Sequence, residues 1–170
     1  MGSMTHRFTR RDVVRLAAAS GPMALAGLLV PSHAFAAVGV PVGTLRLTDA
    51  AWHARLAPEA YAVLRQAATE RPFSRPLLGE HRRGTFDCAG CALPLFASIT
   101  KFDSGTGWPS FWNHFPRAVS ERSDDTLGFD RTEVRCARCD GHLGHVFQDG
   151  PRPTGLRYCM NGAALHFRPT

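Results

Sequence analysis

Residues 131–147 read Arg-Thr-Glu-Val-Arg-Cys-Ala-Arg-Cys-Asp-Gly-His-Leu-Gly-His-Val-Phe, two β-rich runs on either side of a Cys-x-x-Cys turn. A second such turn, Cys88-Ala-Gly-Cys91, lies far upstream after another β-rich run. This is the spacing of two zinc knuckles, because each turn presents two sulfur atoms and tetrahedral zinc takes four thiolates. We therefore predict one zinc ion held by Cys88, Cys91, Cys136 and Cys139. Four protein ligands leave no open coordination position, so this zinc would be structural and would clamp the strand near Cys88 to the strand near Cys136.

Two other interpretations of the cysteine pairs stay open on the sequence. An exported protein could use the same four cysteines in disulfides. A single Cys-x-x-Cys turn is also typical of thioredoxin-like redox enzymes, in which it lies at a strand-to-helix junction. The duplication of the turn argues against the redox interpretation.

Short β-rich runs recur from Gly84 to the C-terminus, and clusters of Gly, Pro and Asp at 103–109, 123–130 and 148–155 separate them. The predicted strands are Gly84–Cys88, Pro94–Ala97, Thr132–Cys136, Leu143–Phe147, Leu156–Cys159 and Ala164–Phe167. Upstream, Thr48 is placed to cap a short helix over residues 49–55, and Pro58 to open a second helix that runs to about Ala68. The predicted fold is mainly β and antiparallel, with two or three short N-terminal helices.

The first 36 residues resemble a signal for the export of a folded protein. They contain the twin-arginine pattern Thr9-Arg-Arg-Asp-Val-Val-Arg15, then an apolar stretch, then Ala34-Phe-Ala36 with small residues for a signal peptidase. The apolar stretch, residues 16–30, is shorter than the roughly twenty residues that span a membrane. We predict cleavage before Ala37 and a periplasmic or otherwise exported protein. An uncleaved anchor and a plain amphipathic helix stay open.

The rest of the chain divides into a leader and one domain. Residues 37–46 are small, apolar and contain Gly and Pro, which predicts a flexible leader, and residues 47–170 are long enough for a single core. The formal net charge is +6, and residues 1–36 supply half of it. No basic stripe remains in the other residues, which argues against a nucleic-acid-binding protein.

Cys159 is the one cysteine outside the two pairs. An odd cysteine in a chain that also carries a His-x-x-His element, here His142 and His145, is a candidate catalytic nucleophile. Residues two apart share a strand face, so Arg157 would lie beside Cys159 and would either lower its pKa or hold an acidic partner such as Asp149. The alternative is an inert buried thiol.

Five segments of the chain together resemble the methionine sulfoxide reductase B family. They are Thr69-Glu-Arg-Pro-Phe-Ser74, Lys101-Phe-Asp-Ser-Gly-Thr-Gly-Trp-Pro-Ser-Phe111, residues 131–139, Gly141-His-Leu-Gly-His-Val-Phe-Gln-Asp-Gly150 and Gly155-Leu-Arg-Tyr-Cys-Met-Asn161. The resemblance runs from about Leu47 to Phe167 and keeps the order of the family's motifs. It implies two antiparallel sheets packed as a β-sandwich or β-tent with a zinc clamp. It also implies reduction of the R epimer of methionine sulfoxide, and hence repair of oxidised exported proteins.

The resemblance further implies the residues of the site. The catalytic residues would be Cys159, His145, His142, Asn161, Arg157 and Asp149. In this scheme a Cys159 thiolate attacks the sulfoxide sulfur, His145 or His142 protonates the departing oxygen, and Asn161 orients the substrate or a bound water. Trp108 would hold the S-methyl group of the substrate. We assign Phe111 to the same substrate-binding set, with packing in the core as the alternative.

The chain departs from many members of this family at Thr106, where they carry a second, resolving cysteine. Because every other cysteine is assigned to zinc, Cys159 has no disulfide partner and should finish the first turnover as a sulfenic acid. An external thiol or a thioredoxin-like protein would then reduce it. We expect a monomer that acts on oxidised methionine in proteins, with free methionine sulfoxide left open. A zinc-stapled binding module without turnover and a zinc-ribbon nucleic-acid binder are the alternative functions.

Overall fold

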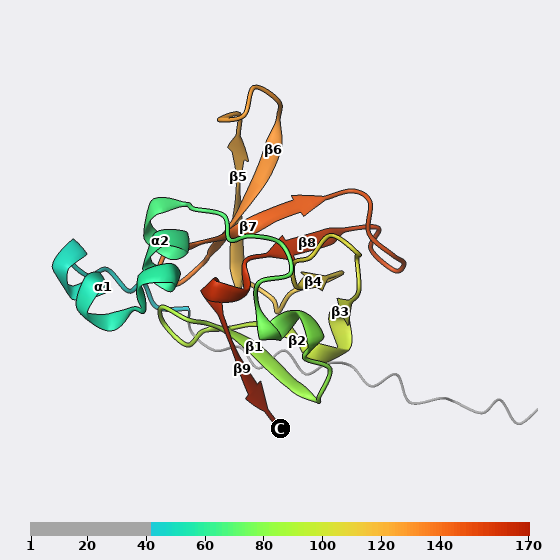
Figure 1. Cartoon of the computed structure of the whole chain (residues 1–170), viewed down its shortest axis with the longest axis horizontal. Coiled ribbons are helices and arrows are strands. Elements are labelled where there is room, and N and C mark those ends of the chain that lie inside the picture. The colour runs from blue at the N-terminus through green and yellow to red at the C-terminus, as the bar shows by residue number, and fades with distance from the viewer. Residues whose placement is uncertain (1–41) are drawn as a thin grey trace, which may run out of the picture. The chain divides into compact units, whose positions relative to one another are not determined.

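The computed structural model of the protein describes residues 42–170 (Figure 1). The predicted signal, its cleavage point and most of the predicted leader lie outside these residues. Val42 and Leu45 pack against the core, and Leu45 N donates to the carbonyl of Arg138 at 2.8 Å. Val42 and Leu45 thus contact the body, and the flexibility of the leader at residues 37–46 stays a prediction.

Two α-helices begin the described chain, as predicted. Helix α1 spans Asp49–Arg55, and the Thr48 side chain accepts from Ala51 N at its start. Helix α2 spans Pro58–Gln66 with Pro58 in the first turn. It ends two residues earlier than predicted because Ala67 takes a left-handed backbone conformation, φ 53°, and stops the helix.

Short 3-10 helices connect the other elements. They are η1 (Pro76–Gly79), η2 (Ser98–Thr100) and η3 (Gly162–Ala164). No helix within residues 42–170 is long and apolar enough to cross a membrane.

The body consists of two antiparallel sheets, which confirms the predicted fold class. The smaller sheet has the strand order β2-β1-β9, with β1 Gly84–Cys88, β2 Pro94–Ala97 and β9 Leu165–Pro169. The larger sheet has the order β3-β4-β8-β7-β6-β5. Its strands are β3 Lys101–Phe102, β4 Ser110–Phe111, β5 Val119–Asp124, β6 Arg131–Cys136, β7 His142–Phe147 and β8 Arg157–Met160.

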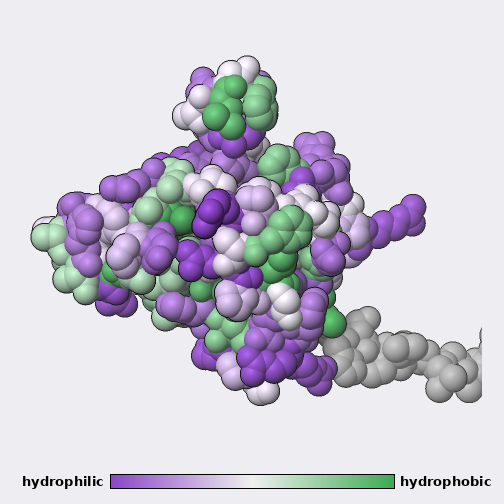
Figure 2. Space-filling model, viewed as in Figure 1, coloured by the Kyte–Doolittle hydropathy of each residue, from purple (hydrophilic) through white to green (hydrophobic). Residues whose placement is uncertain are grey.

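Three strands of the larger sheet were not predicted. Strands β3 and β4 are only two residues long, too short for an alternating pattern to be visible. Strand β5 is polar, with Glu121, Arg122 and Ser123 exposed, and it pairs with β6 in a hairpin that stands out from the body (Figure 1). The tip of this hairpin carries Leu127 and Phe129, 61% and 59% exposed, and appears as a hydrophobic patch in Figure 2.

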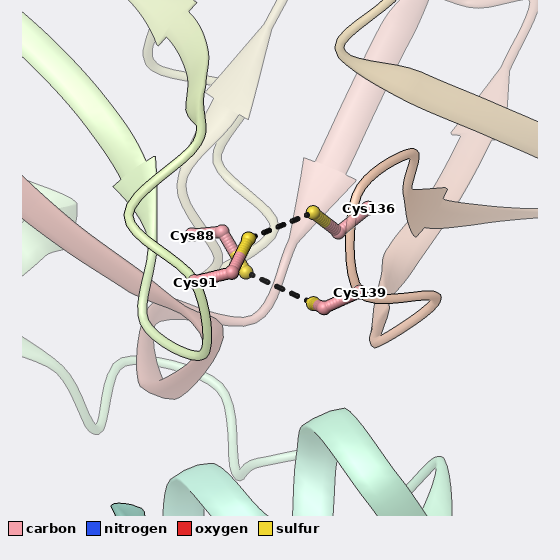
Figure 3. Close-up of side chains that lie close together, drawn as sticks. All are labelled: Cys88, Cys91, Cys136 and Cys139. Carbon is pink, nitrogen blue, oxygen red and sulfur yellow. Dashed lines mark hydrogen bonds between the residues drawn. The ribbon is translucent and has the colours of Figure 1, made fainter. Parts of the chain in front are cut away.

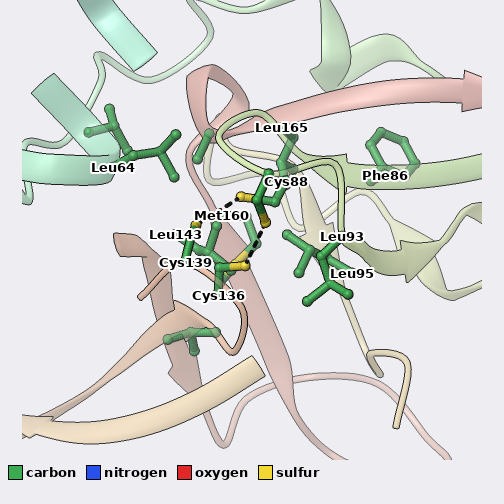
Figure 4. Packing of buried hydrophobic residues seen from close by; sticks show 14 of the residues in the cluster. Leu64, Phe86, Cys88, Leu93, Leu95, Cys136, Cys139, Leu143, Met160 and Leu165 are labelled. Carbon is green, nitrogen blue, oxygen red and sulfur yellow. Dashed lines mark hydrogen bonds between the residues drawn. The ribbon is translucent and has the colours of Figure 1, made fainter. Parts of the chain in front are cut away.

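The core lies around β1 and the central strands of the larger sheet. Its aromatic centre is formed by Phe86, Phe96 and Phe111, all fully buried, with the Phe96 and Phe111 rings stacked at 4.4 Å between centroids. The four paired cysteines are part of the same core (Figure 4). Around them lie the apolar side chains of Leu64, Leu93, Leu95, Leu143, Met160 and Leu165. Helix α2 contacts β7 and η3, so it covers the edge of the core next to these cysteines.

Candidate active site and metal centre

Cys88, Cys91, Cys136 and Cys139 converge on one point (Figure 3). Their sulfur atoms all lie within 4.8 Å of one another, and all four side chains are buried. The Sγ atoms of Cys88 and Cys139 are 3.6 Å apart and those of Cys91 and Cys136 are 3.5 Å apart. These distances are too long for a disulfide, which needs about 2.0 Å. They are near the roughly 3.8 Å that separates the sulfurs of a tetrahedral site with metal–sulfur bonds of about 2.3 Å.

The two turns that carry these cysteines have matching backbones. Ala92 N donates to Cys88 O at 2.8 Å, and Asp140 N donates to Cys136 O at 2.9 Å. Ala92 and Asp140 are also both left-handed, with φ of 57° and 55°. One turn follows β1 of the smaller sheet and the other follows β6 of the larger sheet, so a metal bound here would join the two sheets. The donor set and its geometry fit one tetrahedral ion.

Cys159 lies on β8, in the interior of the larger sheet. Ser110 of β4 is its register partner on one side and His145 of β7 on the other, and His145 in turn pairs with Glu133 of β6. Side chains directly opposite each other in antiparallel strands lie on the same face of a sheet. A hydroxyl, a thiol, an imidazole and a carboxylate therefore form one row across four strands.

Three hydroxyl groups lie on the β4 side of Cys159. Thr106 Oγ1 is 3.9 Å from Cys159 Sγ and 2.8 Å from Ser104 Oγ, which is 2.7 Å from Ser110 Oγ. Burial raises the pKa of the Cys159 thiol above its ordinary value. Hydrogen bonding from Thr106 and the positive charge of Arg157 act in the opposite direction but do not outweigh burial. The predicted influence of Arg157 on this pKa thus has the expected sign, and the resting thiol is nevertheless mostly protonated at neutral pH.

Arg157 also holds the acidic partner that the sequence offered as an alternative. Its Nε and Nη2 donate to the two carboxylate oxygens of Asp149, both at 2.8 Å, and this pair lowers the pKa of Asp149. The guanidinium carbon lies 4.3 Å from the centroid of the Phe147 ring. Two fixed contacts orient the guanidinium, so it keeps its place beside Cys159.

The two histidines have different environments. His142 is 3% exposed and donates from Nδ1 to Glu133 Oε1 at 2.7 Å. Burial lowers the pKa of His142 against the opposing influence of Glu133, so this ring is neutral at neutral pH. His145 is less buried and donates from Nε2 to Asp124 Oδ2 at 2.7 Å. Of the two histidines, only His145 combines partial exposure with a position directly opposite Cys159.

Asp124 is a site residue that sequence reasoning missed, because it lies in the polar 123–130 cluster assigned to a turn. Hydrogen bonds from Thr126 and His145 hold the pKa of Asp124 well below its usual range, and Arg131 Nη2 donates to the same carboxylate at 2.6 Å. An ionised Asp124 accepts from Nε2–H of His145 and thereby selects its tautomer. Nδ1 is then the nitrogen of His145 that can exchange a proton.

Asn161 and Trp108 both bind the main chain of Glu70. Asn161 is 3% exposed, and its amide donates to Leu143 O at 3.1 Å and accepts from Glu70 N at 3.0 Å. Both ends of the amide are therefore held by the protein. The indole of Trp108 donates to Glu70 O at 3.2 Å and is only partly buried.

The structure contradicts the assignment of Phe111 to the substrate-binding set. Phe111 is fully buried and stacks on Phe96, with Phe86 edge-on at 4.9 Å between centroids. It pairs in register with Tyr158, whereas Cys159 pairs with Ser110, so its side chain points to the opposite face of the sheet. Packing in the core accounts for Phe111.

A depression of about 340 Å³ lies away from this constellation, beside the turn of Cys136 and Cys139. The residues that line it include Arg46, Arg65, Arg122 and Arg138, and none of the predicted catalytic residues. The Cys159 row thus lies outside this depression.

Known proteins with similar sequences share most of the described chain. A family model described as the SelR domain matches residues 56–169. A protein named peptide methionine sulfoxide reductase MsrB from Thiobacillus denitrificans is 56% identical over 123 residues, which are 72% of this chain and 93% of that protein. Proteins of the same name from Agrobacterium fabrum and Bradyrhizobium diazoefficiens are 54% and 58% identical, over 72% and 69% of this chain and 91% and 86% of those proteins.

Proposed function

Because the chain belongs to the methionine sulfoxide reductase B family, whose members are oxidoreductases, we propose that it reduces the R epimer of methionine sulfoxide at Cys159. The observation that carries this proposal is the row formed by Ser110, Cys159 and His145 across adjacent strands. A thiol with a hydroxyl on one side and an imidazole on the other is equipped to attack an electrophilic centre and to manage the accompanying protons. The family's substrate supplies such a centre in the sulfoxide sulfur.

The proposed first step transfers oxygen from the substrate to Cys159. The thiol proton passes to Nδ1 of His145 as Sγ attacks the sulfoxide sulfur, and His145 then gives this proton to the sulfoxide oxygen. The sulfur–oxygen bond of the substrate and the new sulfur–sulfur bond both break as the hydroxyl group passes to Sγ, which yields methionine and a Cys159 sulfenic acid. Cysteine sulfur is oxidised by two electrons and the substrate sulfur is reduced by two.

We assign the acid to His145 for two reasons. It lies opposite Cys159 in register, and the contact of its Nε2 with Asp124 fixes its tautomer and leaves Nδ1 free. Burial disfavours a charge on His142, which suits a supporting contact to Glu133 better than proton transfer. Trp108, with its indole nitrogen bound and its ring partly exposed, supplies an aromatic face for the S-methyl group.

Turnover of purified R and S epimers with dithiothreitol tests this function. We expect the R epimer to be reduced and the S epimer to be left unchanged, and Cys159→Ser to abolish turnover. His145→Gln should slow the single-turnover first step by roughly 10²–10⁴-fold, the usual contribution of a general acid. His142→Gln serves as the matched control. An equal loss in both histidine variants, or none in either, would contradict the assignment of the acid.

We propose zinc as the metal of the four-cysteine cluster. Cys88, Cys91, Cys136 and Cys139 would hold it, and its contribution is structural, since four thiolates saturate a tetrahedral ion. Metal binding of this kind contributes on the order of 10 kcal/mol to folding in small zinc domains. Neither Cys159 nor His145 belongs to the cluster, so the proposed chemistry does not pass through the metal.

The zinc content of purified variants distinguishes the role of the four-cysteine cluster from that of Cys159. Cys88→Ser and Cys139→Ser should each bring zinc below one ion per chain and lower the thermal unfolding temperature, because each removes one thiolate from a buried site. Cys159→Ser should retain full zinc, as measured by elemental analysis of purified protein. Full occupancy in both cluster variants would show that the metal is held elsewhere.

We propose a catalytic cycle that uses one cysteine. Thr106 Oγ1, on the 103–109 loop, lies 3.9 Å from Cys159 Sγ, and a hydroxyl cannot form a disulfide. The sulfenic acid would instead condense with an external thiol, releasing water, and a second thiol would free Cys159 as an external disulfide forms. The proposed substrate is oxidised methionine in proteins. Free methionine sulfoxide carries the same sulfoxide group and would react in the same way.

Thr106→Cys should convert this cycle into one with an internal disulfide. The 3.9 Å between Thr106 Oγ1 and Cys159 Sγ lets a thiol at position 106 reach Cys159 after a shift of about 2 Å. After one turnover without reductant, peptide mapping should find the new disulfide in the variant and a dimedone-trapped sulfenic acid in the wild type. Ser123→Cys, on the exposed edge strand β5, is the matched control and should behave like the wild type. A wild-type disulfide between Cys159 and any cluster cysteine would overturn the one-cysteine cycle.

We also propose that residues 1–36 direct export by the twin-arginine route and that the enzyme repairs exported proteins. The support is the sequence pattern of this segment. Replacing Arg10 and Arg11 by lysine should leave the precursor in the cytoplasm, and wild-type protein recovered from the periplasm should begin at Ala37 by N-terminal sequencing. Recovery of an intact Met1 or Met4 terminus from that fraction would refute cleavage.

A further inference from the structure

Residues 69–75, here called the Glu70 loop, connect helix α2 to η1 and contain one of the motifs to which the proposed chemistry gives no role. The loop bridges two segments that are far apart in the sequence. One is the 103–109 loop, which carries Thr106 and Trp108, and the other is the segment 161–163 that follows Cys159. Glu70 contacts both.

The side chain of Glu70 attaches the loop to the segment after Cys159. The carboxylate is 5% exposed and accepts from Gly162 N at 2.7 Å and from Ala163 N at 2.8 Å. Arg75 Nε lies 3.5 Å from the same group. The approach is close enough that a Cβ on Gly162 would stand 2.8 Å from Arg75 Cβ and 3.2 Å from Glu70 Oε1. Hydrogen bonds of an ionised carboxylate to two backbone N–H groups are strong and directional.

The main chain of Glu70 binds the side chains of Asn161 and Trp108. Its N–H donates to Asn161 Oδ1 at 3.0 Å, and its carbonyl accepts from Trp108 Nε1 at 3.2 Å. One residue thus binds both the amide of Asn161 and the indole of Trp108.

A second set of contacts holds the Glu70 loop against the 103–109 loop. Phe73 N donates to Gly107 O at 2.8 Å. Gly107 has a φ of +91°, and a Cβ there would lie 2.7 Å from Pro72 Cβ and 2.9 Å from the Phe73 ring. The two loops therefore touch through backbone as well as through the Trp108 indole, and a displacement of one moves the other.

We propose that Glu70 is a positioning residue, which sets the orientation of Trp108 and Asn161 relative to Cys159 and thereby the affinity for the sulfoxide. The proposal rests on the function assigned to the Cys159 row. The carboxylate anchors the loop to the end of β8, and the backbone of the same residue transmits that anchor to the indole. Loss of the anchor should loosen the substrate-binding wall without altering the nucleophile, because none of the Glu70 hydrogen bonds reaches Cys159 or His145.

Glu70→Gln tests the anchor, since it keeps the volume of the side chain and one acceptor but removes the charge. We expect KM for the R epimer to rise about tenfold, the ratio that corresponds to loss of one hydrogen bond to a charged group, with kcat nearly unchanged. Glu70→Ala should raise KM further, and if it fails to fold, Glu70→Gln carries the test alone. Glu80→Gln is the matched control. It also removes a carboxylate that lies beside an arginine, here Arg82 at 2.6 Å, but Glu80 is outside the Glu70 loop.

Fluorotryptophan NMR of the protein without substrate gives a readout that activity cannot. The chain has three tryptophans, and Trp52, buried in α1, reports on the integrity of the core. In Glu70→Gln the Trp108 resonance should shift or broaden while that of Trp52 stays in place, and the rate at which iodoacetamide alkylates Cys159 should match the wild type. An unchanged Trp108 resonance with an unchanged KM would overturn the proposal. A shift of the Trp52 resonance as well, or a fall in kcat at constant KM, would also overturn it.

These readouts separate the proposal from the function on which it rests. If wild-type protein reduced neither epimer, the proposed function would fail, whereas the Trp108 resonance would still report whether Glu70 holds the indole.

Discussion

The convergence of four buried thiols is the constraint from which the arrangement of the described chain follows. Each sheet contributes one tight turn, and the two turns meet within a few ångströms, so the sheets have a fixed separation at that corner. A chain of this size buries a modest core, and the metal proposed here would cross-link its two sheets and remove much of the freedom that would otherwise separate them. The apolar side chains around the cysteines depend on the same junction (Figure 4).

The row of Ser110, Cys159, His145 and Glu133 lies in the larger sheet, which this junction would hold against the smaller one. Cys159 lies on an interior strand, with β4 and β7 bonded on either side, so its position is set by two ladders of backbone hydrogen bonds. The carboxylates that bind the side chains near Cys159 lie farther from this strand. Asp124 acts on His145 from the edge strand, and Asp149 acts on Arg157 from the turn after β7. Glu70 is the exception, since it reaches the segment after β8 from the loop that follows α2.

The sequence predicted those features that depend on local pattern. Spacing alone indicated the cysteine turns, alternation indicated β1, β2, β6 and β7 to within a residue or so, and the Thr48 cap was found where the pattern placed it. The sequence pattern did not predict the features that depend on the register between strands. Strand β4 is two residues long, so nothing in the sequence told which of Ser110 and Phe111 faces Cys159, and Phe111 was assigned wrongly. The roles of Asp124 and Glu70 arise from contacts across 21 and 91 residues, respectively, which no local pattern encodes.

The burial of Cys159 has a consequence for selectivity among oxidants. Because burial raises the pKa of this thiol, only a small fraction is ionised before a ligand arrives. Peroxides attack thiolates, so the resting protein presents them with little target. Activation can instead accompany binding, when a sulfoxide displaces water and its oxygen is placed to share a proton. A buried thiol of this kind would react slowly with peroxides until a ligand binds.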